Sequence, residues 1–499
     1  MRKTKRFILI FTCAAIVLSL TSCSKKEVTT QPTKAALSPS QVLNLPCDYN
    51  DTLSPYSIKS ETNFYLVSLV YDSLIKMGEK CKYEPNLAES FNETVSSVTV
   101  TLAQKVFSDG SPVTSDDVIY SFESARSSER YSDRLSAFSQ AQKKDDKTII
   151  FYTHGSSPNS AALLTFPIVK KENPNIGSGR YYKAESTDSA PILLYNQYYD
   201  ESKKPEIDSI YLVNCSDYSS ALAMYNNYSI DFYYDRMDMG SKQNADGQTG
   251  SCKLNNLIYL GLNEKNKYLS DKAFRAAISY SIDQTILCKK AYLGLGAATT
   301  VPTPADKYDM GSVIVNSPIS DPTNAKAAFK KAGYKYNSLG VKLLDGKKQI
   351  TLNLLVCSDN LLKSALAREI KTQLANLGVE VNIKSVAKEE YISQVKKEDF
   401  DMYIGEVKLT DNFSLECFFC SGDTSYGIKN SPVCPTYTGY LEGTSTLQNF
   451  ISTFCDENPF IPILYRHSLV YHSNLIKGDF SCYEDDLFLN ILDWEYTNV

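Results

Sequence analysis

The segment from Gln349 to Ile404 constrains the fold more than any other part of the chain. Apolar residues alternate with polar ones over 350–356 and again over 379–383, while those between, at 366–377, recur at helical spacing. A strand, a helix and a second strand joined by short links predict a parallel pair of strands with a right-handed crossover. This pattern predicts the α/β class.

The residues after this unit extend the same sheet. A helix with Tyr391 and Val395 on one face leads to a plausible third strand at Phe400–Ile404. In such sheets ligands approach the carboxyl ends of the strands. We therefore expect a ligand near the segment that begins at Gly405.

An earlier stretch predicts a strand, a turn and a helix in close succession. Residues 98–102 alternate as on a half-buried strand, and Phe107–Gly110 then turns the chain. Thr114 is a good N-cap, and Asp116 and Asp117 suit the positive end of the helix dipole.

One further helix is predicted near the middle of the chain, from Asp271, which can cap it, to Gly294, which can end it. Its apolar stripe consists of Phe274, Ile278, Ile282 and Ile286. We interpret this stripe as part of a hydrophobic core.

The first 23 residues are typical of an export signal. Basic residues precede an apolar run from Phe7 to Leu20, which is shorter than the ~20 residues needed to span a bilayer. Leu20-Thr21-Ser22-Cys23 resembles a bacterial lipobox. We therefore expect residues 1–22 to be removed, Cys23 to carry a lipid, and residues 23–37 to form a flexible tether. An uncleaved anchor helix is the alternative.

With either form of anchor, the body of the protein is expected outside the cytoplasm, on the outer face of a single membrane or in a periplasm.

The chain of 499 residues is too long for one core and predicts two or three lobes. Its net charge of −5 becomes more negative once the basic signal is removed, which disfavours nucleic acid and anionic lipid as partners. Its 35 tyrosines against one tryptophan suit contact with ligands of mixed polarity, or half-exposed strand positions.

The cysteines do not outline a compact disulfide scaffold. Cys13 leaves with the signal and Cys23 takes the lipid, so an odd number remains for pairing. Cys417 and Cys420 have the separation of a redox or zinc half-site, but a second such pair is missing and the chain has only three histidines. We interpret them as two cysteines in an aromatic segment, and we predict no metal site and no cofactor.

Catalytic motifs are missing from the sequence. It contains no G-x-S-x-G elbow, no H-E-x-x-H and no P-loop pattern. We therefore predict a protein that is not an enzyme and has no catalytic residues, with an exported hydrolase of peptides or glycans, built on a carboxylate pair, as the alternative.

Several motifs, in order along the chain, resemble those of the family 5 extracellular solute-binding proteins of bacterial ABC importers. The most recognisable is the run from Phe107 to Val118, which is similar to the family's F-x-D-G-x-P-[LV]-T-A-x-D-V. The others are Tyr71–Ile75, Glu84–Ser90, Gly177–Tyr181, Phe274–Asp283, Ala325–Tyr334, Gln373–Gly378 and Ile461–Tyr465.

The resemblance implies a periplasmic-binding-protein-like (type II) clamp of two lobes with an additional third domain. We expect lobe I to combine residues 38–60, 175–258 and 467–499, domain II to span 61–174, and lobe III to span 259–466. It also implies a monomer that encloses a solute and delivers it to an ABC permease with a separate ATPase, and that has no nucleic acid partner. A surface receptor or adhesin that has kept the clamp without transport is a further alternative.

The segment after the third strand departs from the family's pattern. Family members usually carry a tryptophan and an aspartate pair there, and in peptide binders an aspartate holds the peptide's amino group. In this chain Glu406 or Asp411 is expected to bind an amine and Lys408 a carboxylate, with a solvated loop of mixed charge as the alternative.

Position relative to the family's motifs suggests further ligand-binding residues. An oligopeptide is the expected ligand, with sugar oligomers or another amphipathic solute as alternatives, while few histidines disfavour nickel without a carrier. Core packing is the alternative for each tyrosine among these candidates. The candidates are Lys59, Ser60, Glu61, Thr62, Tyr131, Tyr259, Tyr426 and Tyr465.

Overall fold

The computed structural model describes residues 42–497 apart from 79–81, 185–189, 201, 203, 239, 305–319 and 421–431. These residues belong to one compact unit, Gln41–Val499. The signal, Cys23, the tether and Tyr426 lie outside the described residues, so the predictions about them stay predictions. None of the helices in the described part of the chain has the length and apolar character needed to span a bilayer.

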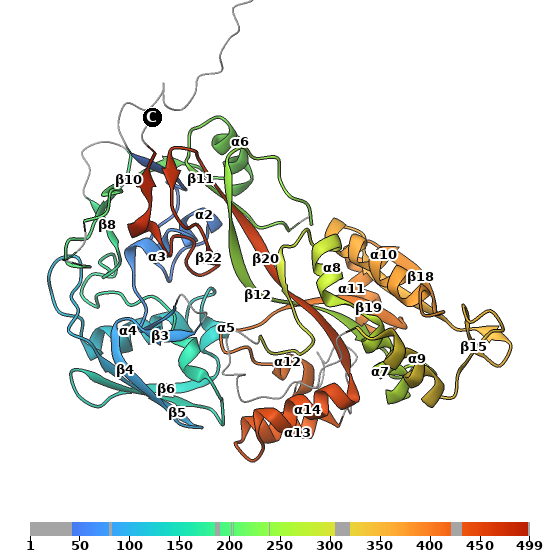
Figure 1. Cartoon of the computed structure of the whole chain (residues 1–499). Helices are drawn as coiled ribbons and strands as arrows, with labels where there is room; N and C mark the ends of the chain where they lie inside the picture. Colours follow the sequence, from blue (N-terminus) through green and yellow to red (C-terminus); the bar gives the residue numbers. More distant parts are fainter. Residues whose placement is uncertain are drawn as a thin grey trace, which may run out of the picture. The chain divides into compact units, whose positions relative to one another are not determined.

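The largest sheet has eight strands, six of them in the order β11-β20-β12-β19-β17-β18. Its longest strands, β12 (Gln248–Leu262) and β20 (Phe460–His472), pair antiparallel and run side by side through the middle of Figure 1. The other strands of this sheet are β11 (Phe232–Asp235), β13 (Gly296–Ala298), β17 (Thr351–Cys357), β18 (Glu380–Val386), β19 (Met402–Lys408) and β22 (Cys482–Tyr483).

The predicted strand–helix–strand unit is confirmed. β17 pairs parallel with both β18 and β19, and α10 (Leu361–Ala375) connects β17 to β18. Gly378, with φ +83°, turns the chain into β18 at low cost because glycine tolerates the left-handed region. α11 (Lys388–Lys396) then leads to β19, the predicted third strand.

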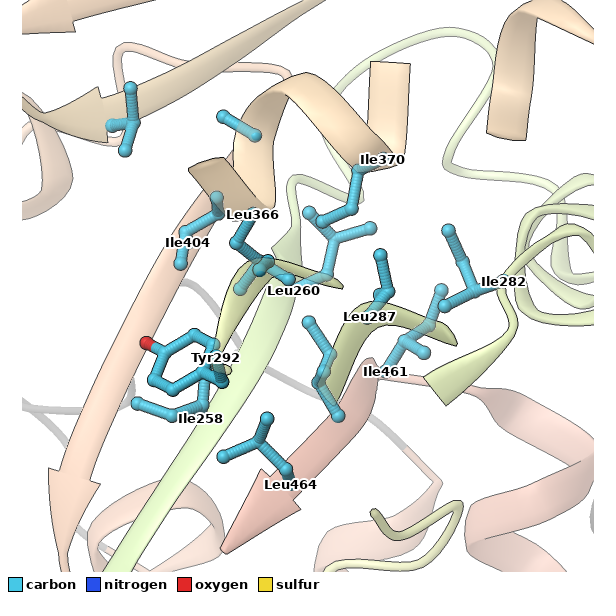
Figure 2. Packing of buried hydrophobic residues seen from close by; sticks show 14 of the residues in the cluster. Ile258, Leu260, Ile282, Leu287, Tyr292, Leu366, Ile370, Ile404, Ile461 and Leu464 are labelled. Atoms are coloured by element: carbon cyan, nitrogen blue, oxygen red, sulfur yellow. The ribbon is translucent and has the colours of Figure 1, made fainter. Parts of the chain in front are cut away.

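The apolar face of α10 packs on the sheet and on a neighbouring helix. Figure 2 shows Leu366 and Ile370 of α10 close to Leu260 of β12 and to Leu287. All four side chains are fully buried. This cluster fixes α10, and with it the path of the chain from β17 to β19.

The predicted helix from Asp271 to Gly294 is wrong in its continuity. It is divided into α7 (Lys272–Ser281) and α8 (Gln284–Ala291). Ile282 is extended, and the Asp283 carboxylate caps α8 by accepting a hydrogen bond from the Ile286 N–H at 2.9 Å. A short polar side chain competes with helix continuation in this way. As a result Ile286 is 40% exposed instead of lying in the core.

Two four-stranded sheets have the orders β1-β10-β9-β8 and β4-β5-β7-β6. The first contains β1 (Leu43–Cys47), β8 (Tyr181–Ala184), β9 (Ile192–Tyr195) and β10 (Ser209–Asn214). The second contains β4 (Ala88–Glu93), β5 (Ser97–Leu102), β6 (Phe138–Lys143) and β7 (Thr148–Thr153).

The strand and helix expected near residues 98–125 are both confirmed. Val98, Val100 and Leu102 of β5 are buried. α4 (Ser115–Arg126) begins with a capping box, because the Thr114 N–H and hydroxyl both donate to the Asp117 carboxylate, at 2.9 and 2.7 Å.

The other described helices and strands are short. The helices are α2 (Glu61–Phe64), α3 (Val67–Val70), α5 (Ser132–Leu135), α6 (Ala221–Asn226), α9 (Pro322–Lys331), α12 (Glu416–Phe419), α13 (Val433–Leu441) and α14 (Leu447–Glu457), with 3-10 helices at Ser160–Leu163, Tyr218–Ser220 and Ile491–Asp493. The strands are β2 (Ile75–Met77), β3 (Tyr83–Pro85), β14 (Lys335–Tyr336), β15 (Leu343–Asp345), β16 (Lys348–Gln349), β21 (Ile476–Lys477) and β23 (Glu495–Tyr496).

β12 and β20 connect separate hydrophobic cores. β12 places Cys252 in one core, Leu257 in a second and Ile258 in a third, and β20 also contributes to all three. The β12–β20 register shifts between Lys253 and Leu257, as at a β-bulge. The expected domain boundaries at 258/259 and 466/467 fall inside these strands, and the positions of the boundaries stay a prediction.

We predict that Ile370→Ala lowers the free energy of unfolding by about 2–5 kcal/mol, because it leaves a cavity in a fully buried cluster. Urea denaturation measures this change. The matched control is Ile392→Ala on α11, whose side chain is 41% exposed and whose removal should cost well under 1 kcal/mol. Similar losses for the two variants would contradict the packing.

His472, at the end of β20, gives the fold a pH dependence. Its ring stacks on Phe480 with centroids 3.3 Å apart, and burial lowers its pKa to about 4. Since this folded-state pKa lies below the unfolded one, the contribution to stability is full above about pH 6.5 and is lost as the pH falls toward 4.

We predict that, between pH 6.5 and 4, wild type loses roughly 1–3 kcal/mol more of its unfolding free energy than His472→Gln does. Urea titrations of both proteins at several pH values measure the two slopes. Each slope is the change of unfolding free energy with pH, so comparing the two slopes removes the constant cost of losing the ring stack. Equal slopes for the two proteins would contradict the lowered pKa of His472.

Candidate ligand-binding cavity

A cavity of about 510 Å³ lies where residues from three hydrophobic cores meet. Its walls come from α2, α3, β2, β3, α5, β12 and the segments after β19 and β22. Six aromatic rings line it, from Phe64, Tyr71, Tyr83, Tyr131, Tyr199 and Tyr483. Its charged residues are six acids, Asp72, Asp133, Asp411, Glu484, Asp485 and Asp486, and six bases, Lys76, Arg130, Arg134, Arg180, Lys253 and Lys408.

Three of the residues expected to bind ligand line this cavity. They are Tyr131, Lys408 and Asp411. Tyr131 is the N-cap residue of α5, Lys408 is the last residue of β19, and Asp411 follows that end of the strand, where the sheet pattern directed attention. No bound ligand tests their role, so it stays a prediction.

Arg134 of α5 connects three segments at the cavity. Its Nε lies 3.3 Å from the Asp411 carboxylate, and its Nη2 donates to both Asp485 oxygens at 3.0 and 2.8 Å. Its Nη1 donates to the Thr165 hydroxyl at 2.8 Å. The guanidinium thereby joins α5 to the segments that follow β19 and β22, and each of its three nitrogens has a partner.

The Asp411 carboxylate is fully engaged by protein groups. It is 6% exposed and accepts hydrogen bonds from the Thr165 hydroxyl and the Asn255 amide, each at 2.8 Å, besides facing Arg134. The Tyr83 hydroxyl donates to the Asp411 backbone carbonyl at 2.9 Å. A ligand amine at this carboxylate would therefore have to displace a protein partner.

Lys408 pairs with a carboxylate of the segment after β22. Its Nζ lies 2.7 Å from Glu484, and although burial lowers the pKa of Lys408, Glu484 raises it by more. Desolvation raises the pKa of the neighbouring Asp485, whose side chain is 40% exposed, but Arg134 and Lys408 hold that pKa below its usual range. Glu484 thus faces the cation at the end of β19, and Asp485 faces the cation on α5.

Asp72 and Lys76 are two cavity charges with little pairing. Burial raises the pKa of Asp72, and the Asn86 amide, Arg180 and Lys76 offset this only in part. Among the described residues, Lys76 has no carboxylate within ion-pair distance. Both groups line the cavity and are available to a bound solute.

Residues 59–62 lie outside the cavity lining but hold one of its bases. Glu61 accepts a hydrogen bond from Arg130 at 2.7 Å, and the Lys59 carbonyl accepts another at 2.9 Å. Ser60 caps α2, and Thr62 is buried. Of these four residues, Glu61 and Lys59 thus hold Arg130 in place, and the ligand-binding role of all four stays a prediction.

Glu406 also lies outside the cavity lining. Its carboxylate faces Lys363 at 2.7 Å and Arg466 at 3.1 Å, and it accepts a hydrogen bond from Asn256 at 2.7 Å. Burial raises the pKa of Glu406, but the two cations lower it by more. It anchors the sheet, and we no longer count it as a ligand-binding residue.

Tyr259 and Tyr465 belong to the core, which was the alternative for both. They are 1% and 5% exposed and lie in the same hydrophobic cluster. The Tyr259 and Tyr403 hydroxyls are hydrogen-bonded at 3.0 Å, and the Tyr465 hydroxyl donates to the Pro302 carbonyl at 2.5 Å. Neither ring reaches the cavity, so both are removed from the candidate site.

Sequence reasoning missed several cavity residues. Asp72 lies in the Tyr71–Ile75 motif, which served only to support the family resemblance. The acidic run Glu484–Asp486 is visible in the sequence but was not interpreted as part of a site. Arg134 had no sequence signal, because its partners lie far away along the chain.

Cys417 and Cys420 lie at α12, away from the cavity lining. Burial raises the pKa of Cys417 to about 12, which keeps its thiol protonated and unreactive. Within the described ranges, no group of three potential metal ligands comes together.

Comparisons with known proteins agree with this architecture. The family model "Bacterial extracellular solute-binding proteins, family 5 Middle" matches residues 82–421. Oligopeptide-binding protein AppA of Bacillus subtilis is 26% identical over 372 residues, which cover 67% of this chain and 67% of that protein.

Two solved structures have a similar fold at low sequence identity. An ABC transporter substrate-binding protein from Sinorhizobium meliloti has a TM-score of 0.73 at 18% identity, covering 92% of this chain and 100% of that one. The unliganded open form of MppA, a periplasmic murein tripeptide binding protein, has a TM-score of 0.71 at 18% identity, covering 89% of this chain and 97% of that one.

The fold is thus the type II periplasmic-binding-protein-like clamp of two lobes with an additional third domain. The chain belongs to the family 5 bacterial extracellular solute-binding proteins, which confirms the resemblance found in the sequence. The relatives named above are binding proteins rather than enzymes.

We predict that Arg134→Ala lowers the free energy of unfolding by about 3–5 kcal/mol, because it leaves the buried Asp411 carboxylate, and the more exposed Asp485, without their cation. Asp411→Asn in the same protein should recover part of this loss. Urea denaturation of the single and double variants gives the coupling energy.

The control for this cycle is Arg126→Ala, which removes an arginine whose carboxylate partner, Glu123, is 3.9 Å away and exposed. Its cost should be at most about 1 kcal/mol. Additive effects of Arg134→Ala and Asp411→Asn would contradict the proposed pairing.

Proposed function

We propose that this protein captures an oligopeptide in the cavity between its lobes and delivers it to an ABC transporter permease with a separate ATPase. Lipid on Cys23 would hold the monomeric protein at the outer face of the membrane, or in a periplasm. The observation that supports this most is the cavity itself. Its volume of about 510 Å³ falls in the usual range for ligand sites, and its walls combine rings with charges of both signs.

The lining suits a peptide better than a uniformly charged or apolar solute. Tyrosine rings contact apolar side chains while their hydroxyls bond to polar groups, and Tyr131 and Tyr199 both line the space. Peptides carry an amine and a carboxylate at opposite ends. The cavity offers an acid, Asp72, and a base, Lys76, that are not consumed by strong internal pairing.

The cavity charges that are already paired within the protein are less available to hold a peptide. Asp411 and Lys408 already bind Arg134 and Glu484, so they contribute to a ligand only by exchanging partners. We therefore propose Asp72 for the peptide's cationic group, Lys76 for its carboxylate and Tyr131 for a side-chain contact. Capture then shifts the population toward the closed clamp, since the closed form binds more tightly.

We predict that purified protein binds short peptides and that Lys76→Gln weakens binding about tenfold, because a charge-assisted hydrogen bond becomes a neutral one. Isothermal titration calorimetry with a peptide and with its C-terminally amidated form measures the effect. The amide should bind wild type more weakly, yet bind Lys76→Gln and wild type alike.

The control is Lys144→Gln, in an exposed turn outside the cavity lining, which should leave affinity unchanged. Native mass spectrometry of freshly purified protein identifies any solute that remains bound. Failure of a diverse peptide library to bind or to raise the melting temperature would refute the peptide assignment.

The same samples separate the alternatives. Release of cleaved peptide or glycan, abolished by one carboxylate substitution, would favour an exported hydrolase. Retention of a sugar oligomer would redirect the ligand assignment, and normal peptide uptake by cells lacking the protein would favour a receptor or adhesin.

A further inference from the structure

A small basic sheet stands at the edge of the lobe built around α10. Its strands have the order β14-β15-β16, and it follows α9 directly along the chain. In Figure 1 the β15 region extends beyond α9 and β18. We call the surface formed by the end of α9 together with this sheet, residues 326–348, the lysine hairpin.

The lysine hairpin carries a concentrated positive charge. All its lysine side chains are exposed, and it contains no arginine. Its single acid, Asp345, is already paired with Lys267 at 2.6 Å. The lysines are Lys326, Lys330, Lys331, Lys335, Lys342, Lys347 and Lys348.

None of these seven lysines has a carboxylate partner within the described residues. The contrast with the rest of the molecule is large, because the whole chain has a net charge of −5. Unpaired positive charge on the end of α9 and the adjoining sheet is therefore a local feature and is not explained by composition.

The tip of the hairpin exposes two apolar side chains among these charges. Leu339 is 80% exposed and Val341 is 58% exposed. The turn is well formed, since the Asn337 side chain accepts hydrogen bonds from the backbone N–H groups of Val341 and Lys342 at 2.9 and 3.0 Å. Their exposure is thus imposed by the turn.

The base of the hairpin is fixed to the lobe. Leu343 is fully buried and its N–H donates to the Gly378 carbonyl at 3.0 Å, while the Tyr336 hydroxyl donates to the Leu377 carbonyl at 3.0 Å. A firm base lets the hairpin present its tip and its lysines together.

We propose that the lysine hairpin docks on an anionic phospholipid bilayer, with Leu339 and Val341 entering the headgroup boundary and the lysines facing the lipid phosphates. Exposed lysines together with exposed aliphatic side chains bind such a surface through electrostatic attraction and apolar burial. This contact is separate from solute capture. The negative net charge of the whole chain disfavours anionic lipid as a partner, but the local charge of the lysine hairpin is positive.

The residue types favour lipid over a protein partner. Protein interfaces are enriched in arginine and depleted in lysine, because the guanidinium makes directed paired hydrogen bonds. The hydrated lysine ammonium suits a diffuse, fluid layer of charge. An uninterrupted set of lysines with two exposed aliphatic residues therefore matches a membrane surface.

The test uses residues 41–499, which form one compact unit and lack the lipidated cysteine. Co-sedimentation compares neutral phosphatidylcholine vesicles with vesicles in which about a third of the lipid is phosphatidylglycerol, at low and high salt. Wild type should bind the anionic vesicles and should lose most of this binding at high salt.

Two variants remove the two parts of the proposed surface. Lys335→Gln with Lys342→Gln and Lys347→Gln should weaken binding on the order of 100-fold, since each lysine near an anionic surface contributes about fivefold. Leu339→Ser with Val341→Ser should weaken it at least about tenfold. The matched control, Lys144→Gln with Lys147→Gln and Lys171→Gln, removes three exposed lysines elsewhere and should bind as wild type does.

Circular dichroism and peptide affinity should be unchanged in every variant, which keeps this test independent of the proposed transport role. Equal binding to neutral and anionic vesicles would overturn the proposal, as would full binding by the triple lysine variant. Absence of vesicle binding, together with hairpin-dependent binding to a purified permease, would overturn it in favour of a protein partner.

Discussion

The Arg134 guanidinium is the contact through which the separate parts of the cavity are related to one another. It faces Asp411 from one side and Asp485 from the other, and it reaches Thr165 as well. Buried ion pairs of this kind add little net stability over an apolar contact, because both ions lose their hydration. Such pairs favour one arrangement of the segments that form the cavity, since a segment in another position would leave a charge without a partner.

The same principle explains why the cavity is charged yet nearly neutral. Lys408 is matched by Glu484, and Arg180 by Asp486 at 2.8 Å. A solute therefore meets an interior in which most charges already have partners. Discrimination among solutes then depends on the few groups that are less engaged, and on the aromatic rings between them.

The sequence was most informative about features that depend on interactions between residues close together in the chain. The alternation at 350–356, the Thr114 cap and the Gly378 turn each depend on neighbouring residues, and the structure has all three. Local reasoning failed at Asp283, where a side-chain cap prevails over a continuous apolar stripe. Among the site residues, Tyr131 and Tyr259 have the same chemistry and differ only in what the distant chain packs against them. The role of Arg134 could not be predicted from the sequence, because its partners come from segments that meet only in the folded chain.

The irregular pairing within β12 lies beside residues of the cavity wall on the same strand. The register slips between Lys253 and Leu257, and Lys253 and Asn255 in that stretch line the cavity. Asn255 also donates to Asp411 across the space. One short stretch of β12 therefore carries both a break in strand pairing and two side chains of the cavity wall, so a peptide held as we propose would touch this strand where its pairing is least regular.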